Sequence, residues 1–73
     1  MLAIEAQVIA EATQQANGHW VFEGKDTHSW WGEGEHLRKL AERAGNENNY
    51  REYADEASII ADCLQRLDNN EQS

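Results

Sequence analysis

The sequence has few cysteines and few basic residues, and both shortages narrow what the protein can be. Cys63 is the single cysteine of the 73-residue chain, which excludes an internal disulfide. Chains of this size usually need extra stabilisation, so a second subunit or a metal gains weight as its source. Six lysine and arginine residues stand against fourteen acids, for a formal net charge of −8. Because nucleic acids and anionic membranes bind to basic patches, we expect neither as a direct ligand, and a basic protein partner fits better.

Long apolar runs are also missing. No window approaches the roughly 20 apolar residues that a membrane-spanning helix needs. Met1 is followed by a short apolar stretch at residues 2–4 and then by Glu5, with no basic residue ahead of it, so we expect no secretory signal. The sequence therefore predicts one domain over residues 1–73 in a soluble, cytoplasmic protein.

The clearest pattern in the chain is an apolar stripe with alternating spacings of three and four residues, the spacing of one helical face. Its members are Tyr50, Tyr53, Ala57, Ile60, Leu64 and Leu67. The intervening residues are polar and mostly acidic. We predict an amphipathic helix over about residues 48–68 as the organising element, followed by a polar tail over residues 69–73 that frays.

Two further helices are predicted ahead of it. Residues 2–16 contain no glycine or proline and are rich in good helix formers, and Asn17-Gly18 would end that helix. Its expected inner side comprises Leu2, Ala6, Ile9, Ala12 and Ala16, widened by Ile4 and Val8. Residues 33–44 form the second predicted helix, which starts near the Gly-Glu-Gly sequence at residues 32–34 and ends at Gly45.

Between these helices, residues 19–31 predict a short β-hairpin. Aromatic and β-branched residues flank a glycine-containing break, and a loop at residues 24–26 would pair Trp20 with Trp30. The alternative is that Ser29 caps a helix that starts with the tryptophans. The predicted fold class is mainly α with a short β-hairpin, in the order α-ββ-α-α.

The Trp30-Trp31 dipeptide predicts an interaction surface. Neighbouring residues on a strand point to opposite faces, so one core cannot bury both indoles. We expect Trp30 in the core with Trp20 and Phe22, and Trp31 at the rim or in an interface.

Residues suited to catalysis, to metal binding or to DNA reading are poorly arranged. The histidines and Cys63 lack the close spacing of zinc ligands, and Cys63 lies in an acidic helix that would raise its pKa. The segment LAERAGNENNYREY resembles a helix-turn-helix, with Ala41 four residues before Gly45, but the acids that follow would repel phosphates, so a plain αα-hairpin is preferred. We predict no enzyme, no metal and no cofactor.

The strongest indication of function is the acidic side of the last helix. Its acids are Glu52, Asp55, Glu56 and Asp62. Rows of carboxylates can imitate DNA phosphates or occupy a nucleic-acid groove on a basic protein. The leading hypothesis is a small acidic non-enzymatic interaction protein, an inhibitor or DNA-mimicking decoy of a basic nucleic-acid-handling protein, with Trp31 as an added contact. The alternatives are a merely solvated helix face, a helical homodimer with an assembly role, and a small metal-binding or catalytic domain.

Overall fold

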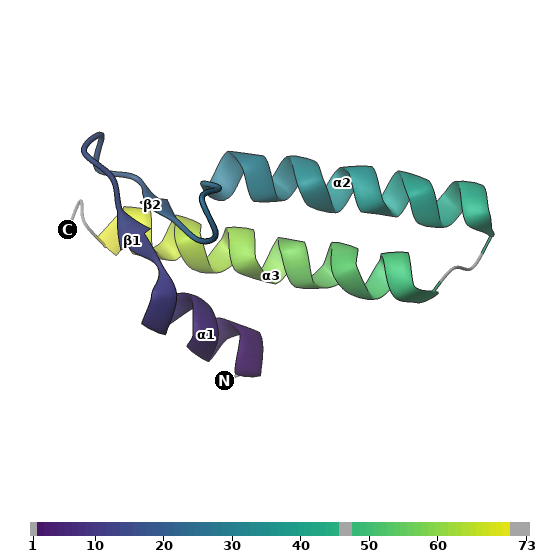
Figure 1. Cartoon of the computed structure of the whole chain (residues 1–73), viewed down its shortest axis with the longest axis horizontal. Coiled ribbons are helices and arrows are strands. Elements are labelled where there is room, and N and C mark those ends of the chain that lie inside the picture. The colour runs from purple at the N-terminus through teal and green to yellow at the C-terminus, as the bar shows by residue number, and fades with distance from the viewer. Residues whose placement is uncertain (1, 46–47, 71–73) are drawn as a thin grey trace.

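The computed structural model describes residues 2–45 and 48–70. Its elements are α1 (Ala3–Glu11), β1 (Thr13–Gln14), β2 (Trp20–Val21), α2 (Thr27–Ala44) and α3 (Asn48–Asn70). The predicted class, mainly α with a short hairpin, is confirmed. Helices α2 and α3 run antiparallel side by side, while α1 and the hairpin gather around the C-terminal half of α3 (Figure 1). None of the described helices combines the length and apolar character needed to cross a membrane.

The seam between α2 and α3 is built from small residues. Gly34 and Ala41 of α2 and Ala54 and Ala57 of α3 are all buried, and Gly34 lies beside Ala54 and Ala57. A Cβ at Gly34 would lie 3.3 Å from the carbonyl oxygen of Ala54, so a glycine permits this close approach of the two backbones.

The predicted start of the second helix near residue 33 is wrong. Helix α2 begins at Thr27, because the side chain of Asp26 accepts a hydrogen bond from the backbone N–H of Ser29 at 2.9 Å and caps the helix. Both Gly32 and Gly34 lie inside α2. The tryptophans at 30 and 31 also belong to this helix, as the alternative interpretation held, although the capping residue is Asp26.

The predicted hairpin over residues 19–31 is wrong in its position. Strand β2 pairs with β1, which precedes it, in the antiparallel register Thr13↔Val21 and Gln14↔Trp20. The predicted first helix over residues 2–16 ends at Glu11, since residues 13–14 are extended and hydrogen-bonded to β2. Asn17-Gly18 lies in the connection between the strands, where Gly18 has a φ of 90°.

A second tight turn follows β2 and replaces the predicted loop at residues 24–26. Phe22 and Lys25 exchange two backbone hydrogen bonds, of 3.0 and 3.1 Å. The two residues between them, Glu23 and Gly24, both have positive φ angles, of 52° and 78°. Positive φ at both central positions is characteristic of a type I′ turn, in which Gly24 is readily accommodated and Glu23 is strained.

The core lies where α1, the turn after β2 and α2 meet α3. Val8 and Leu64 are fully buried, and the indole N–H of Trp30 donates to the carbonyl oxygen of Phe22 at 3.1 Å. Trp20 is half-buried against this core.

Six residues expected on buried stripes are instead solvent-exposed: Leu2, Ala6, Ile9, Ala16, Tyr50 and Tyr53. On α1, Val8 is the buried residue and Ile4 and Ala12 pack beside it, whereas Leu2 and Ile9 each remain 54% exposed. On α3, the stripe is covered at Ile60 and Leu64 but open at the tyrosines, because α1 lies against the other half of the helix (Figure 1). The tail predicted over residues 69–73 is helical at 69–70, and its remainder lies outside the described residues.

Candidate interaction groove

A hollow of about 300 Å³ opens between α1, the turn at residues 22–25, α2 and α3. Its floor is apolar, and its edge carries charged and polar side chains. The lining residues are Ile4, Gln7, Phe22, Glu23, Lys25, Trp30, Glu33, Leu37, Tyr53, Glu56, Ala57 and Ile60. We refer to this hollow as the acidic groove.

The charges of the acidic groove are predominantly negative. Glu23 comes from the turn, Glu33 from α2 and Glu56 from α3, so three elements converge their carboxylates on one opening. Lys25 is the single base in the lining, and its Nζ lies 4.6 Å from the centroid of the Trp30 ring, in a cation–π contact. The groove therefore combines an apolar floor with a net negative edge.

Of the four acids proposed on α3, Glu56 alone lines this groove. Glu52 and Asp55 are exposed on the same helix. Within residues 2–45 and 48–70, the carboxylates of Glu52, Asp55 and Glu56 form no ion pair. These three side chains therefore carry charge that the described part of the fold does not neutralise.

Asp62 differs from the other three, because it is engaged within the chain. Its carboxylate lies 3.0 Å from Nη2 of Arg66, and the same nitrogen lies 3.2 Å from the carboxylate of Glu5. Glu5 also accepts a hydrogen bond from the backbone N–H of Leu2 at 2.8 Å. That hydrogen bond, reinforced by Arg66, lowers the pKa of Glu5. Asp62 and Glu5 thus help to fasten α1 to α3.

Trp31 lines a different hollow, of about 400 Å³. This second hollow has no lining residue in common with the acidic groove. Trp31 lies in α2 rather than on a strand, and 39% of its surface is exposed. The other residues that line this hollow include His19, Asp26, His28 and Asp68. Trp31 is exposed as expected, but it lines a different hollow from Glu56, the one predicted acid of α3 that lines the acidic groove.

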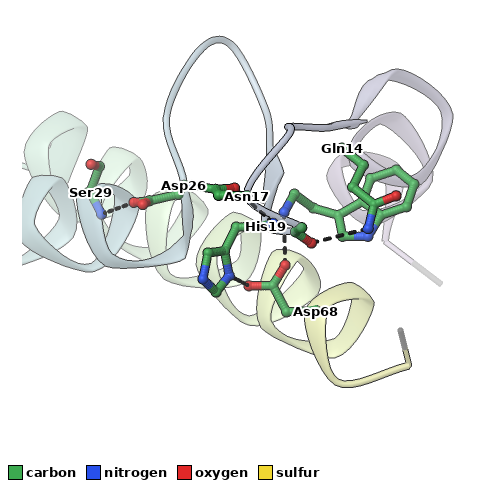
Figure 2. A network of polar contacts seen from close by, with 8 residues as sticks. Gln14, Asn17, His19, Asp26, Ser29 and Asp68 are labelled. Carbon is green, nitrogen blue, oxygen red and sulfur yellow. Dashed lines mark hydrogen bonds and ion pairs between the residues drawn. The ribbon is translucent and has the colours of Figure 1, made fainter. Parts of the chain in front are cut away.

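A network of polar contacts beside this second hollow fixes the hairpin to the end of α3. Asp68 accepts a hydrogen bond from the backbone N–H of Trp20 at 2.8 Å and lies 3.3 Å from Nδ1 of His19 (Figure 2). Within the hairpin, Gln14 donates to the carbonyl of Gly18 at 3.1 Å. The network accounts for the placement of β2 on α3 and gives Asp68 a structural role.

Among the described residues, no three His, Cys, Asp or Glu side chains gather closely enough to hold a metal ion. Cys63 is 4% exposed, and burial raises the pKa of its thiol. A buried thiol of raised pKa is a weak nucleophile.

No protein-family model matches the chain, and neither the curated proteins nor the solved structures compared with it give a match. The geometry of the chain itself therefore has to carry any assignment.

Sequence reasoning missed three parts of the acidic groove: Glu23, Glu33 and the exposed aromatic ring of Tyr53. Tyr53 was assigned to a buried stripe because it has the right spacing. The first predicted helix was given fifteen residues, whereas α1 has nine. Recognising Asn17-Gly18 as a hairpin turn would have shortened that helix to its observed length.

Proposed function

We propose that this protein is a non-enzymatic interaction protein that binds a basic protein partner through the acids of α3 and the neighbouring acidic groove. The observation that carries the proposal is the set of exposed carboxylates at Glu52, Asp55 and Glu56, which have no ion-pair partner in the described chain. Carboxylates left unpaired at a surface attract cationic groups and speed the approach of a basic partner.

A nucleic-acid-handling protein is the class of partner that this charge favours. Such proteins bind phosphates through clusters of lysine and arginine, and a row of carboxylates can occupy the same cluster. By doing so, the chain would compete with nucleic acid and act as an inhibitor or decoy. The net charge of −8 supports this direction of binding and disfavours direct contact with nucleic acid.

A homodimer is the second candidate, and the exposure of Tyr50 and Tyr53 is the observation that favours it. In a two-fold dimer through this face, the same patch would meet itself. Glu33 and Glu56 would then approach their own copies, and such like-charge contacts are unfavourable. The charge distribution therefore favours a basic partner over a second copy.

Charge reversal with a matched control tests the proposal. One variant carries Glu52→Lys, Asp55→Lys and Glu56→Lys, and the control carries the same change at Glu11, Glu35 and Glu42, which are exposed elsewhere. Both variants change the net charge equally, so a difference between them reports the position of the charges. The readout is capture of basic proteins from the source cell on the immobilised chain, by quantitative mass spectrometry over a salt titration.

We expect the wild type and the control to capture a basic protein at low salt and to release it at high salt, as screening shortens the Debye length from about 10 Å at 0.1 M to about 3 Å at 1 M. The α3 variant should lose this capture while keeping its helical circular dichroism. Equal capture by the two variants would show that the acids of α3 have no special role.

A further inference from the structure

The acidic groove is the place where the apolar layer of the fold continues beyond the end of α1. Helix α1 has nine residues and α3 has twenty-three, so at 1.5 Å per residue α1 is about 14 Å long and α3 about 35 Å. Along the stripe of α3, Leu64 is 0% exposed beneath α1, while Tyr53, three turns earlier, is 60% exposed. A third helix is thus present over one half of the α2–α3 pair and absent over the other.

The open half carries the same two kinds of side chain on both helices. On α2, Glu33 and Leu37 are four residues apart and lie one above the other on one side of the helix. On α3, Tyr53 and Glu56 are three residues apart and have the same relationship. The groove therefore presents two apolar surfaces facing one space, each with a carboxylate beside it.

We infer that the acidic groove binds a short amphipathic helix of the basic partner, laid beside Ile4 and Gln7 of α1 over the open half of the α2–α3 pair. An apolar side chain of that helix enters between Leu37 and Tyr53, and lysine or arginine side chains on either side of it reach Glu33 and Glu56. This inference rests on the proposed function and adds the form of the partner segment. The buried anchor supplies affinity, and the exposed charges supply selectivity and rate of association.

A helix fits this groove better than the other secondary structures. An added strand would need an exposed sheet edge beside the groove, and the groove is lined by three helices and a closed turn. A helix instead packs into grooves between helices with the same i, i+4 spacing that Leu37 and Glu33 already show. Net negative charge at the edge selects a basic helix over an acidic one. A second copy of α1 or α3 would be an acidic helix and is therefore disfavoured.

The test uses two synthetic peptides of identical leucine and lysine composition. One has its leucines at helical spacing, and the other alternates leucine with lysine, so that it forms no continuous apolar face as a helix. Binding is measured by fluorescence anisotropy with the full chain and four single variants. Tyr53→Ala is matched by Tyr50→Ala, which removes the other exposed tyrosine of α3 outside the groove. Glu56→Gln is matched by Asp55→Asn, its neighbour outside the groove.

We expect the helical peptide to bind more tightly than the alternating one. Tyr53→Ala should weaken its binding about tenfold or more, corresponding to about 1.4 kcal/mol, whereas Tyr50→Ala should change it less than about twofold. Glu56→Gln should weaken binding about threefold at low salt and reduce its salt dependence, beyond the effect of Asp55→Asn. Circular dichroism of each variant checks that the helices are intact.

Several outcomes would overturn the groove proposal. These are equal effects of Tyr53→Ala and Tyr50→Ala, equal binding of the two peptides, and no binding of the helical peptide. A wild-type dimer in sedimentation equilibrium that Tyr53→Ala dissociates would assign the groove to a second copy instead. None of these results would contradict the capture of basic proteins by the acids of α3. The proposed function and the groove proposal can therefore fail independently of each other.

Discussion

Replacing Gly34 with alanine measures how closely α2 and α3 approach each other. The new Cβ would lie 3.3 Å from the carbonyl oxygen of Ala54, 3.4 Å from Oγ of Ser58 and 3.6 Å from Cβ of Ala57. The carbonyl belongs to the backbone of α3, and the hydroxyl of Ser58 donates to that same carbonyl at 3.1 Å. Neither atom can move independently, so the two helices must separate by a few tenths of an ångström.

Two effects of opposite sign determine how much Gly34→Ala changes the free energy of unfolding. Alanine is favoured over glycine inside a helix by about 0.8–1 kcal/mol. Extra volume in a tightly packed seam costs about 1–3 kcal/mol. We therefore expect Gly34→Ala to range from roughly neutral to about 2 kcal/mol destabilising.

Gly32→Ala is the matched control, because it lies in the same helix and its Cβ would meet nothing within 4 Å. It should receive the propensity gain alone and stabilise the protein by about 0.8–1 kcal/mol. Urea unfolding followed by circular dichroism measures the free energy of unfolding of both variants. In a thermal melt, a change of about 1 kcal/mol should shift the melting temperature of a chain this size by about 4–8 °C. If Gly34→Ala stabilises the protein as much as Gly32→Ala, the close approach of the helices is refuted.

The remaining predictions concern the helix cap, one ion pair, the two tryptophans and the thiol. Asp26→Ala should cost about 1 kcal/mol in urea unfolding, while Asp26→Asn, which preserves a capping oxygen, should cost much less. Because the folded-state pKa of Glu5 lies below its ordinary value of 4.5, its contribution to stability is full above that pH and is lost as the pH falls through the lower folded value, so Glu5→Gln should flatten the acid limb of a stability–pH curve. Trp30→Ala should destabilise the fold by about 3–5 kcal/mol and Trp31→Ala by less than about 1 kcal/mol, and similar losses in thermal melts would contradict their different burial. Cys63 should react with iodoacetamide far more slowly in the native protein than in urea, whereas equal rates would contradict its burial.

The sequence predicted the last helix well, because its stripe and its acidic side are both local properties of one segment. Ala57, Ile60 and Leu64 are buried as their spacing indicated. Which turns of that stripe are covered depends on the length and position of α1, and spacing within α3 carries no information about them. Tyr53 was therefore assigned to the core, although it is exposed.

Around the hairpin and the second helix, the local sequence is compatible with more than one secondary structure, and the predicted boundaries there are wrong. Gly32 and Gly34 resemble a helix boundary, and only the proximity of Ala54 explains why Gly34 is suited to a helix interior. The aromatic residues near Trp30 resemble a strand, but the cap at Asp26 starts a helix there. The acidic groove joins Glu23, Glu33 and Glu56 from three elements, so it could be found only once their packing was known.

Photo-crosslinking from a single position in the source cell tests whether a basic protein docks on the acids of α3 and the neighbouring acidic groove. A benzophenone amino acid replaces Glu56 in one version of the chain and Glu42, on α2 and outside the groove, in the other. The proposed function predicts a crosslinked product with a basic protein from position 56 and not from position 42, lost when Glu52 and Asp55 are changed to lysine. Equal labelling from both positions, or crosslinks from position 56 to acidic proteins alone, would contradict it.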